Sequence, residues 1–241
     1  KSMGIIKHIP NAITSMNLLS GCFSVIFAIN GDYKVALLFI IAAAIFDFCD
    51  GFAARLLRAY SPMGKELDSL ADMVSFGVAP AMMLFSFMQS TTVGLITFVP
   101  LFIAVFSGLR LAKFNIDTRQ TENFIGLATP ACALFCGSLM YALTVYACIA
   151  DFLTEYFYII PLLSIILSYL LTSEIPMFSF KFKNTTWKDN STRFIFLGVV
   201  AILGCITIMA GLDWSIWVLL IFTCYIIINV TALPFSKQKT I

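Results

Sequence analysis

Residues 34–54 read KVALLFIIAAAIFDFCDGFAA, and this stretch decides the fold. Every residue from Val35 to Phe46 is apolar, and a run of about 20 such residues lets a helix cross roughly 30 Å of hydrocarbon. Asp47 and Asp50 nevertheless lie in the same stretch. Because a charged side chain inside a membrane is costly, these two aspartates mark a candidate functional site on a transmembrane helix.

The composition of the whole chain supports the same interpretation. Of its 241 residues, 60% are hydrophobic and 12% are charged, whereas a soluble domain is roughly half apolar and about a quarter charged. These proportions exclude a water-soluble enzyme, a disordered chain and a disulfide-rich secreted module. The net charge of +2 is too small to suggest nucleic-acid binding, so we expect an integral membrane protein in contact with membrane lipids.

Eight apolar runs predict an all-α bundle of about eight transmembrane helices in a single membrane domain, residues 1–241. The runs cover residues 12–29, 34–54, 66–88, 93–115, 127–150, 156–173, 194–210 and 214–233. With eight spans, every Lys and Arg except Lys34 falls on one side, which places both termini in the cytoplasm. We expect the catalytic helices at about 34–88, the last two spans (194–233) at the periphery, and a location in the cytoplasmic (inner) membrane.

Four carboxylates lie inside the predicted spans. Asp47 and Asp50 are separated by three positions, and Asp68 and Asp72 by four, so each pair shares one face of its helix. The turn signal at residues 61–64 makes the two helices antiparallel neighbours, with all four acids at about the same depth. Four such acids cannot all stay ionised and unpaired, and Mg²⁺ or Mn²⁺ with oxygen ligands resolves the conflict.

Two other interpretations of the four acids are open. Buried ion pairs, Asp50 with Arg55 or Asp68 with Lys65, would explain one or two acids but not four. A divalent-cation channel or carrier would need acids or polar breaks that continue across other spans, whereas these acids stop at one depth. We therefore expect a metal-dependent enzyme, with the carrier as the alternative from another class.

The residues from Asp47 to Asp72 resemble a known signature. They read DFCDGFAAR at 47–55, followed by Gly64, Asp68 and Asp72, and match the pattern D-x-x-D-G-x-x-A-R-x8-G-x3-D-x3-D of the CDP-alcohol phosphotransferase family. Within this family the chain is most similar to the membrane-integral, bacterial-type phosphatidylserine synthases. That likeness rests on GKELDSLADMVSFGVAP at 64–80, GLRLAKFN at 108–115 and FIGL at 124–127, and Ala128 departs from the expected proline.

The resemblance implies an activity, with roles for particular residues. It implies transfer of a phosphatidyl group from CDP-diacylglycerol to L-serine, with two Mg²⁺ or Mn²⁺ ions, by a homodimer whose cleft opens to the cytoplasm. Asp47, Asp50 and Asp68 would bind the metal with Asp72 at the edge of the cluster, and Asp72 would also be the general base. The residues expected to contact nucleotide or phosphate are Gly51, Ala54, Arg55, Thr14, Asn17 and Gly64.

The identity of the acceptor depends mainly on the resemblance. Serine needs a partner for its carboxylate, and Arg110 is the best candidate because a guanidinium can hold a carboxylate in two places. Lys113 and Asn115 are possible helpers. Within the family, glycerol 3-phosphate or inositol phosphate are the alternative acceptors, and either would favour additional basic residues around the cleft.

Overall fold

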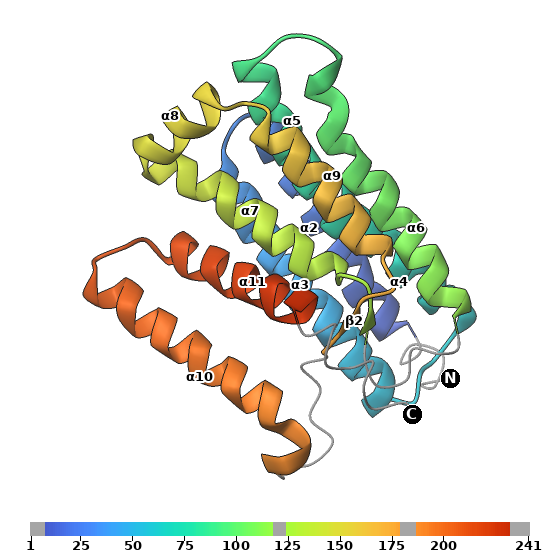
Figure 1. Ribbon diagram of the computed structural model, residues 1–241. Coiled ribbons are helices and arrows are strands. Elements are labelled where there is room, and N and C mark those ends of the chain that lie inside the picture. Colours follow the sequence, from blue (N-terminus) through green and yellow to red (C-terminus); the bar gives the residue numbers. More distant parts are fainter. Residues whose placement is uncertain (1–7, 118–123, 179–186, 232–241) are drawn as a thin grey trace.

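The computed structural model describes residues 8–117, 124–178 and 187–231. Nearly all of these residues are helical (Figure 1). The helices are α2 (Ile9–Ile29), α3 (Tyr33–Leu56), α4 (Pro62–Asp72), the π-helical turn η1 (Met73–Val78), α5 (Ala79–Thr91), the 3₁₀ segment η2 (Leu95–Leu101), α6 (Phe102–Ile116), α7 (Thr129–Val145), α8 (Ala147–Glu155), α9 (Ile159–Thr172), α10 (Trp187–Met209) and α11 (Trp214–Thr231).

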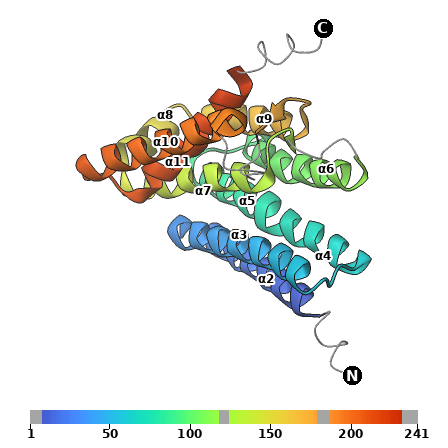
Figure 2. The same ribbon diagram turned by 90° about the horizontal axis from the view of Figure 1, so that it is seen from below.

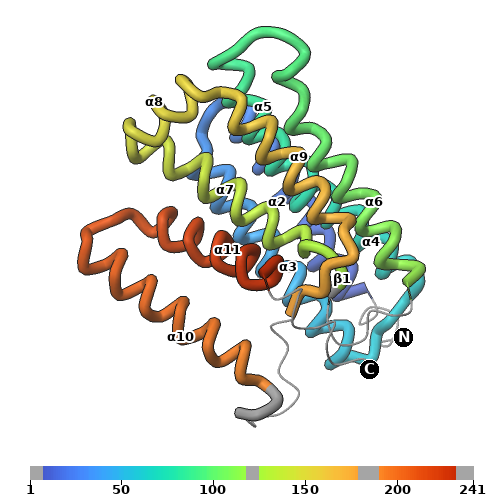
Figure 3. The backbone as a smooth tube through the Cα atoms, viewed as in Figure 1, coloured from blue at the N-terminus to red at the C-terminus, as the bar shows by residue number. Residues whose placement is uncertain are grey.

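The predicted all-helical membrane bundle is confirmed. Among the described residues six helices are long and apolar enough to cross a membrane, or seven if α7 and α8 together form one span. The axes of α7 and α8 differ by 110°, and Figure 3 shows the bend between the two helices. The predicted count of eight would also need α9, which is apolar but has 14 residues. That count stays a prediction, as does the side on which the termini lie, since both ends are outside the described residues.

Local sequence signals begin the helices that carry the acids. The Asp32 side chain accepts a hydrogen bond from the Val35 N–H and caps α3. Ser61 caps α4 in the same way by accepting from the Gly64 N–H at 2.9 Å, and Pro62 occupies the first turn. The loop between the two helices is short, so α3 and α4 lie next to each other with their acids at the same end of the bundle.

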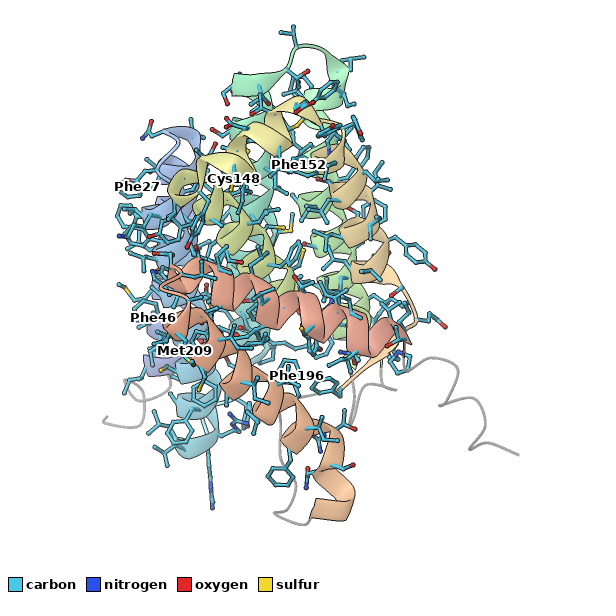
Figure 4. All side chains as sticks on the ribbon, turned by 60° about the vertical axis from the view of Figure 1, so that its left-hand side comes forward. Phe27, Phe46, Cys148, Phe152, Phe196 and Met209 are labelled. Atoms are coloured by element: carbon cyan, nitrogen blue, oxygen red, sulfur yellow. The ribbon has the colours of Figure 1, made fainter. Side chains whose placement is uncertain are left out.

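The helices form layers, which Figure 2 shows from below. The α2–α3 pair forms one layer, the continuous span α4–η1–α5 lies beside it, α7 packs on both α3 and α5, and α6 and α9 lie beyond that span. Helix α11 packs on α7, whereas α10 packs chiefly on α11. Apolar side chains such as Phe152 and Met209 are exposed on the outside, as lipid-facing residues should be (Figure 4).

A short antiparallel pairing connects two loops near the acids. Strands β1 (Phe124–Ile125) and β2 (Pro176–Met177) pair Phe124 with Met177 and Ile125 with Pro176. The pairing brings the segment before α7 against the segment that follows α9. Both segments therefore have a fixed position at the end of the bundle where the acids lie.

Candidate active site

Three of the four intramembrane carboxylates meet at one point. Asp47 and Asp50 from α3 and Asp68 from α4 each place one carboxylate oxygen within 4.8 Å of the others. Asp72 lies one helical turn beyond Asp68, where α4 passes into η1. A π-helical turn inside a longer helix is frequently found at a functional site, because it changes which side chains share a face.

Helix α2 orients two of these acids. The Thr14 hydroxyl donates to Asp50 Oδ2 at 2.6 Å, and Asn17 Nδ2 donates to Asp72 Oδ1 at 3.1 Å. Thr14 and Asn17 are both buried, so these bonds are shielded from water. The nucleotide contact that the sequence suggested for the two residues stays a prediction, and in the structure Thr14 Oγ1 and Asn17 Nδ2 bond to the carboxylates.

The buried oxygens of this cluster fit a metal ion. Asp68 Oδ1 is buried and has no hydrogen-bond partner among the residues that the structure describes. Buried polar atoms nearly always have a partner, and a hard divalent cation takes carboxylate oxygens as ligands. Asp47, Asp50 and Asp68 could therefore hold a metal ion, with Asp50 only 5% exposed.

The acidic cluster separates two cavities, and Asp68 and Lys65 line both. The small cavity, about 210 Å³, lies among α2, α3 and α4, and the large cavity, about 540 Å³, lies among α4, α6, α7 and α11. The small cavity is lined by Pro10, Asn11, Thr14, Asp50, Gly51, Ala54, Ala59, Tyr60, Ser61, Gly64, Lys65 and Asp68. The large cavity is lined by Asp47, Lys65, Asp68, Ser69, Asp72, Arg110, Leu111, Phe114, Asn115, Ala128, Thr129, Pro130, Ala131, Leu134, Phe178, Phe222 and Tyr225.

Small residues leave room in the small cavity. A Cβ added to Gly51 would have nothing within 4 Å, so the backbone of α3 is open to a ligand there. A Cβ added to Gly64 would lie 2.9 Å from Asn11 Oδ1, so α2 and α4 approach each other closely at this glycine. Arg55 is exposed and donates through Nε to the Gly51 carbonyl, and it does not line either cavity.

The three residues predicted to bind serine differ in whether they line the large cavity. Arg110 on α6 is only 7% exposed and lines the large cavity. Asn115 lines it as well, but its amide donates to Ser69 Oγ and its carbonyl accepts from Lys65 Nζ. Lys113 does not line the cavity and forms an ion pair with Glu174 at 3.4 Å. The structure therefore brings Arg110, and not Lys113, to the acids.

Aromatic residues that the sequence analysis missed close the large cavity. Tyr225 on α11 donates to the Phe178 carbonyl, and the Phe178 N–H donates to Asn229 Oδ1. Phe196 on α10, labelled in Figure 4, packs its ring 6.1 Å from that of Tyr225. Phe196 and Tyr225 are part of ordinary apolar runs and Phe178 lies between two of them, so no local pattern distinguishes these residues from lipid-facing aromatics.

Comparisons with known proteins agree with this geometry. The family model for CDP-alcohol phosphatidyltransferases matches residues 7–173. Three similar relatives are the CDP-diacylglycerol–serine O-phosphatidyltransferases of Mycobacterium leprae and Bacillus subtilis and the archaetidylserine synthase of Methanothermobacter thermautotrophicus. The M. leprae protein is 42% identical over 137 residues, which is 54% of this chain and 45% of the relative.

The other two matches have a similar extent along this chain. The B. subtilis protein is 40% identical over 124 residues, 52% of this chain and 70% of the relative. The archaeal protein is 35% identical over 128 residues, 52% of this chain and 54% of the relative. This chain thus spans about half the length of two of these relatives and more of the third.

Proposed function

Because this chain belongs to the CDP-alcohol phosphatidyltransferase family, we propose that it transfers the phosphatidyl group of CDP-diacylglycerol to the hydroxyl of L-serine, giving phosphatidylserine and CMP. The names of the relatives from M. leprae and B. subtilis support serine as the acceptor. The single observation that carries the proposal is the carboxylate cluster between two cavities, with Asp68 lining both. A group transfer needs this arrangement, since donor and acceptor must meet at one reacting centre.

We assign the nucleotide part of the donor to the small cavity. Gly51 and Ala54 leave the surface of α3 open, so a flat base and a phosphate can approach the helix backbone. Lys65 lies at the border of both cavities and supplies a positive charge beside the phosphates. Arg55, at the exposed end of α3, adds a second positive charge where the donor enters.

We assign two Mg²⁺ or Mn²⁺ ions to Asp47, Asp50 and Asp68, with Asp72 at the edge of the group. Bound cations of this kind offset the negative charge that develops on the phosphate of the leaving CMP. Thr14 holds Asp50 in position through its 2.6 Å hydrogen bond. Such bonds to a ligand carboxylate fix its orientation.

Asp72 is the proposed general base. It lines the large cavity, and the Asn17 amide holds one of its oxygens at 3.1 Å, which leaves the other to accept the proton of the serine hydroxyl. The serine oxygen then bonds to the phosphatidyl phosphorus, the bond from that phosphorus to CMP breaks, and CMP leaves with the bonding electrons. Arg110 binds the serine carboxylate, and Asn115 lies within the same cavity.

The lipid substrate fits an integral membrane protein. The acidic cluster lies toward one end of the membrane-length helices. With eight spans, every Lys and Arg except Lys34 would fall on the same side of the membrane as that end. By the positive-inside rule, the cleft would open to the cytoplasm from the cytoplasmic membrane. The homodimer implied by the family resemblance stays a prediction.

The proposal is tested by the release of CMP from CDP-diacylglycerol. The purified chain, in detergent micelles with Mg²⁺ or Mn²⁺, receives labelled L-serine, glycerol 3-phosphate or inositol phosphate in separate reactions. We expect CMP and labelled phosphatidylserine with serine only. Release of CMP with glycerol 3-phosphate instead would overturn the assignment of serine as the acceptor. Metal flux into vesicles that contain the chain, without any release of CMP, would overturn the proposed enzymatic function in favour of a cation carrier.

A further inference from the structure

The N-terminus of α7 faces the large cavity. Ala128, Thr129, Pro130 and Ala131 all line that cavity, and they are the N-cap and the first turn of a 17-residue helix. The positive end of a helix dipole favours an anion, and the first N–H groups of a helix are available to bind one. This end therefore points toward the place where the acceptor would lie.

The position of this helix end is fixed by the chain that precedes it. The Gly126 N–H donates to the Ile175 carbonyl and the Leu127 N–H donates to the Leu170 carbonyl, both at 2.9 Å. Gly126 has a φ of +80°, and a Cβ added there would lie 2.6 Å from the Leu171 carbonyl oxygen. Only glycine permits this approach, which holds the start of α7 against the end of α9.

Several hydrogen-bond donors at this end have no partner within the helix. The first bonded amide is that of Cys132, which donates to the Ala128 carbonyl. Pro130 has no N–H, which leaves Thr129 and Ala131 as donors of the first turn without an intrahelical partner, and the N-cap residue Ala128 has no side-chain oxygen to cap them. Thr129 is only 1% exposed, and its Oγ1 has no hydrogen-bond partner in the described part of the chain.

A second positive group lies on the same cavity. The buried guanidinium of Arg110 comes from α6, and burying a charged group costs free energy unless it is paired and hydrogen-bonded. A carboxylate has two oxygens, so one can accept from Arg110 while the other accepts from the start of α7. A neutral acceptor would offer the start of α7 no negative charge to bind.

We infer that Thr129 and the N-terminus of α7 form the second half of a carboxylate site, which selects hydroxy amino acids over neutral amino alcohols. The inference rests on the proposed function, because it assigns the acceptor to the large cavity. Thr129 is then a specificity-determining residue that contacts the acceptor through its hydroxyl. Asp72 remains the proposed general base.

The first test removes only the hydroxyl. In Thr129→Val, which keeps the shape of the side chain, we expect KM for L-serine to rise about tenfold with KM for CDP-diacylglycerol unchanged. Thr129→Ser should restore the original KM, and Thr129→Ala gives a second deletion if the valine variant fails to fold. Thr97→Val is the matched control, because Thr97 is likewise buried, at 5% exposed, and its Oγ1 has no partner among the described residues, but it lines neither cavity.

The second test separates a charge contact from a structural effect. L-serinamide has the serine hydroxyl and amine without the negative charge, so the wild type should prefer serine. In Thr129→Val the ratio of kcat/KM for serine to that for serinamide should be about tenfold smaller. An unchanged ratio of kcat/KM for the two acceptors would overturn the inference. The increase in Tm that each compound produces gives the same comparison without turnover.

The proposed function and this inference can fail separately. If the wild type uses glycerol 3-phosphate rather than serine, the proposed function is wrong, and the same variants are then measured with that acceptor. A rise in its KM in Thr129→Val would still support an anion site at α7. If the wild type uses no acceptor, a Tm increase with serine that is absent in Thr129→Val supports the site, and equal increases in both proteins refute it.

Discussion

The two cavities beside Asp68 are built in different ways. The small cavity is lined entirely by residues from Pro10 to Asp68, which belong to three consecutive helices and the loop between the last two. The large cavity is lined by residues from Asp47 to Tyr225, and three of them, Phe178, Phe222 and Tyr225, lie beyond the stretch 7–173 that matches the family model. The donor side is thus a local motif, whereas the acceptor side is assembled by tertiary packing.

This difference predicts a separation of kinetic effects. A change that touches only the small cavity should alter the use of CDP-diacylglycerol with any acceptor. A change that touches only the large cavity should alter the use of the acceptor. Asp68 lines both cavities, so its substitution should alter the use of both CDP-diacylglycerol and the acceptor.

The largest effect is expected for Asp68→Asn. The substitution removes one carboxylate of the acidic cluster and leaves its shape, so turnover should fall by at least about a thousandfold at saturating concentrations of both substrates. Wild-type enzyme treated with a chelator should lose activity to the same extent and recover it with Mg²⁺ or Mn²⁺. The measurement is the rate of CMP release.

Asp213→Asn is the control for a lost carboxylate. Asp213 lies outside both cavities, where it accepts from the Tyr141 hydroxyl at 3.2 Å and from the Ser215 N–H. Its variant should keep turnover within about threefold, since only structural bonds of modest energy change. If Asp68→Asn behaves like Asp213→Asn, the cluster is not the reacting centre.

A smaller but still large effect is expected for Asp72→Asn. Asp72 lines only the large cavity and is outside the group of three close carboxylates, so its loss should remove proton transfer without removing the metal site. Turnover should fall about a hundredfold or more, while the affinity for CDP-diacylglycerol stays within about threefold. Equilibrium binding of the labelled donor measures the second quantity. Turnover close to that of the wild type would contradict the assignment of the base.

Arg110→Gln should act on the acceptor alone. The variant loses the buried charge that the large cavity offers to a carboxylate, so KM for serine should rise about a hundredfold with KM for CDP-diacylglycerol unchanged. Lys113→Gln, one turn further along α6, tests the competing prediction. Because Lys113 pairs with Glu174 outside the cavity, its variant should change KM for serine by less than about threefold. An equal rise in KM for serine in both variants would contradict the assignment of the serine site to the large cavity.

The two cavities also differ in how far the sequence predicts them. The spacing of Asp47, Asp50 and Asp68 determines which helix faces carry the acids, and a short turn brings those faces together. Helix periodicity does not tell which way a third helix turns its polar side chains, so the sequence alone does not predict that Thr14 and Asn17 bond to the acids. The contribution of Tyr225 depends on α11 packing against α7, a contact between distant parts of the chain for which no local pattern exists.

Gly51→Val is the complementary change on the donor side, with the smallest expected effect. A Cβ at residue 51 meets nothing within 4 Å, so the protein should fold, and the added methyl groups should occupy part of the small cavity. KM for CDP-diacylglycerol should rise about tenfold with KM for serine unchanged, because only the donor loses space. Gly198→Val on α10 is the matched control, since its Cβ also has open space but lies outside both cavities. A rise in KM for serine of the same size would mean that the two cavities are not separate sites, and the assignment of donor and acceptor to opposite sides of Asp68 would then be wrong.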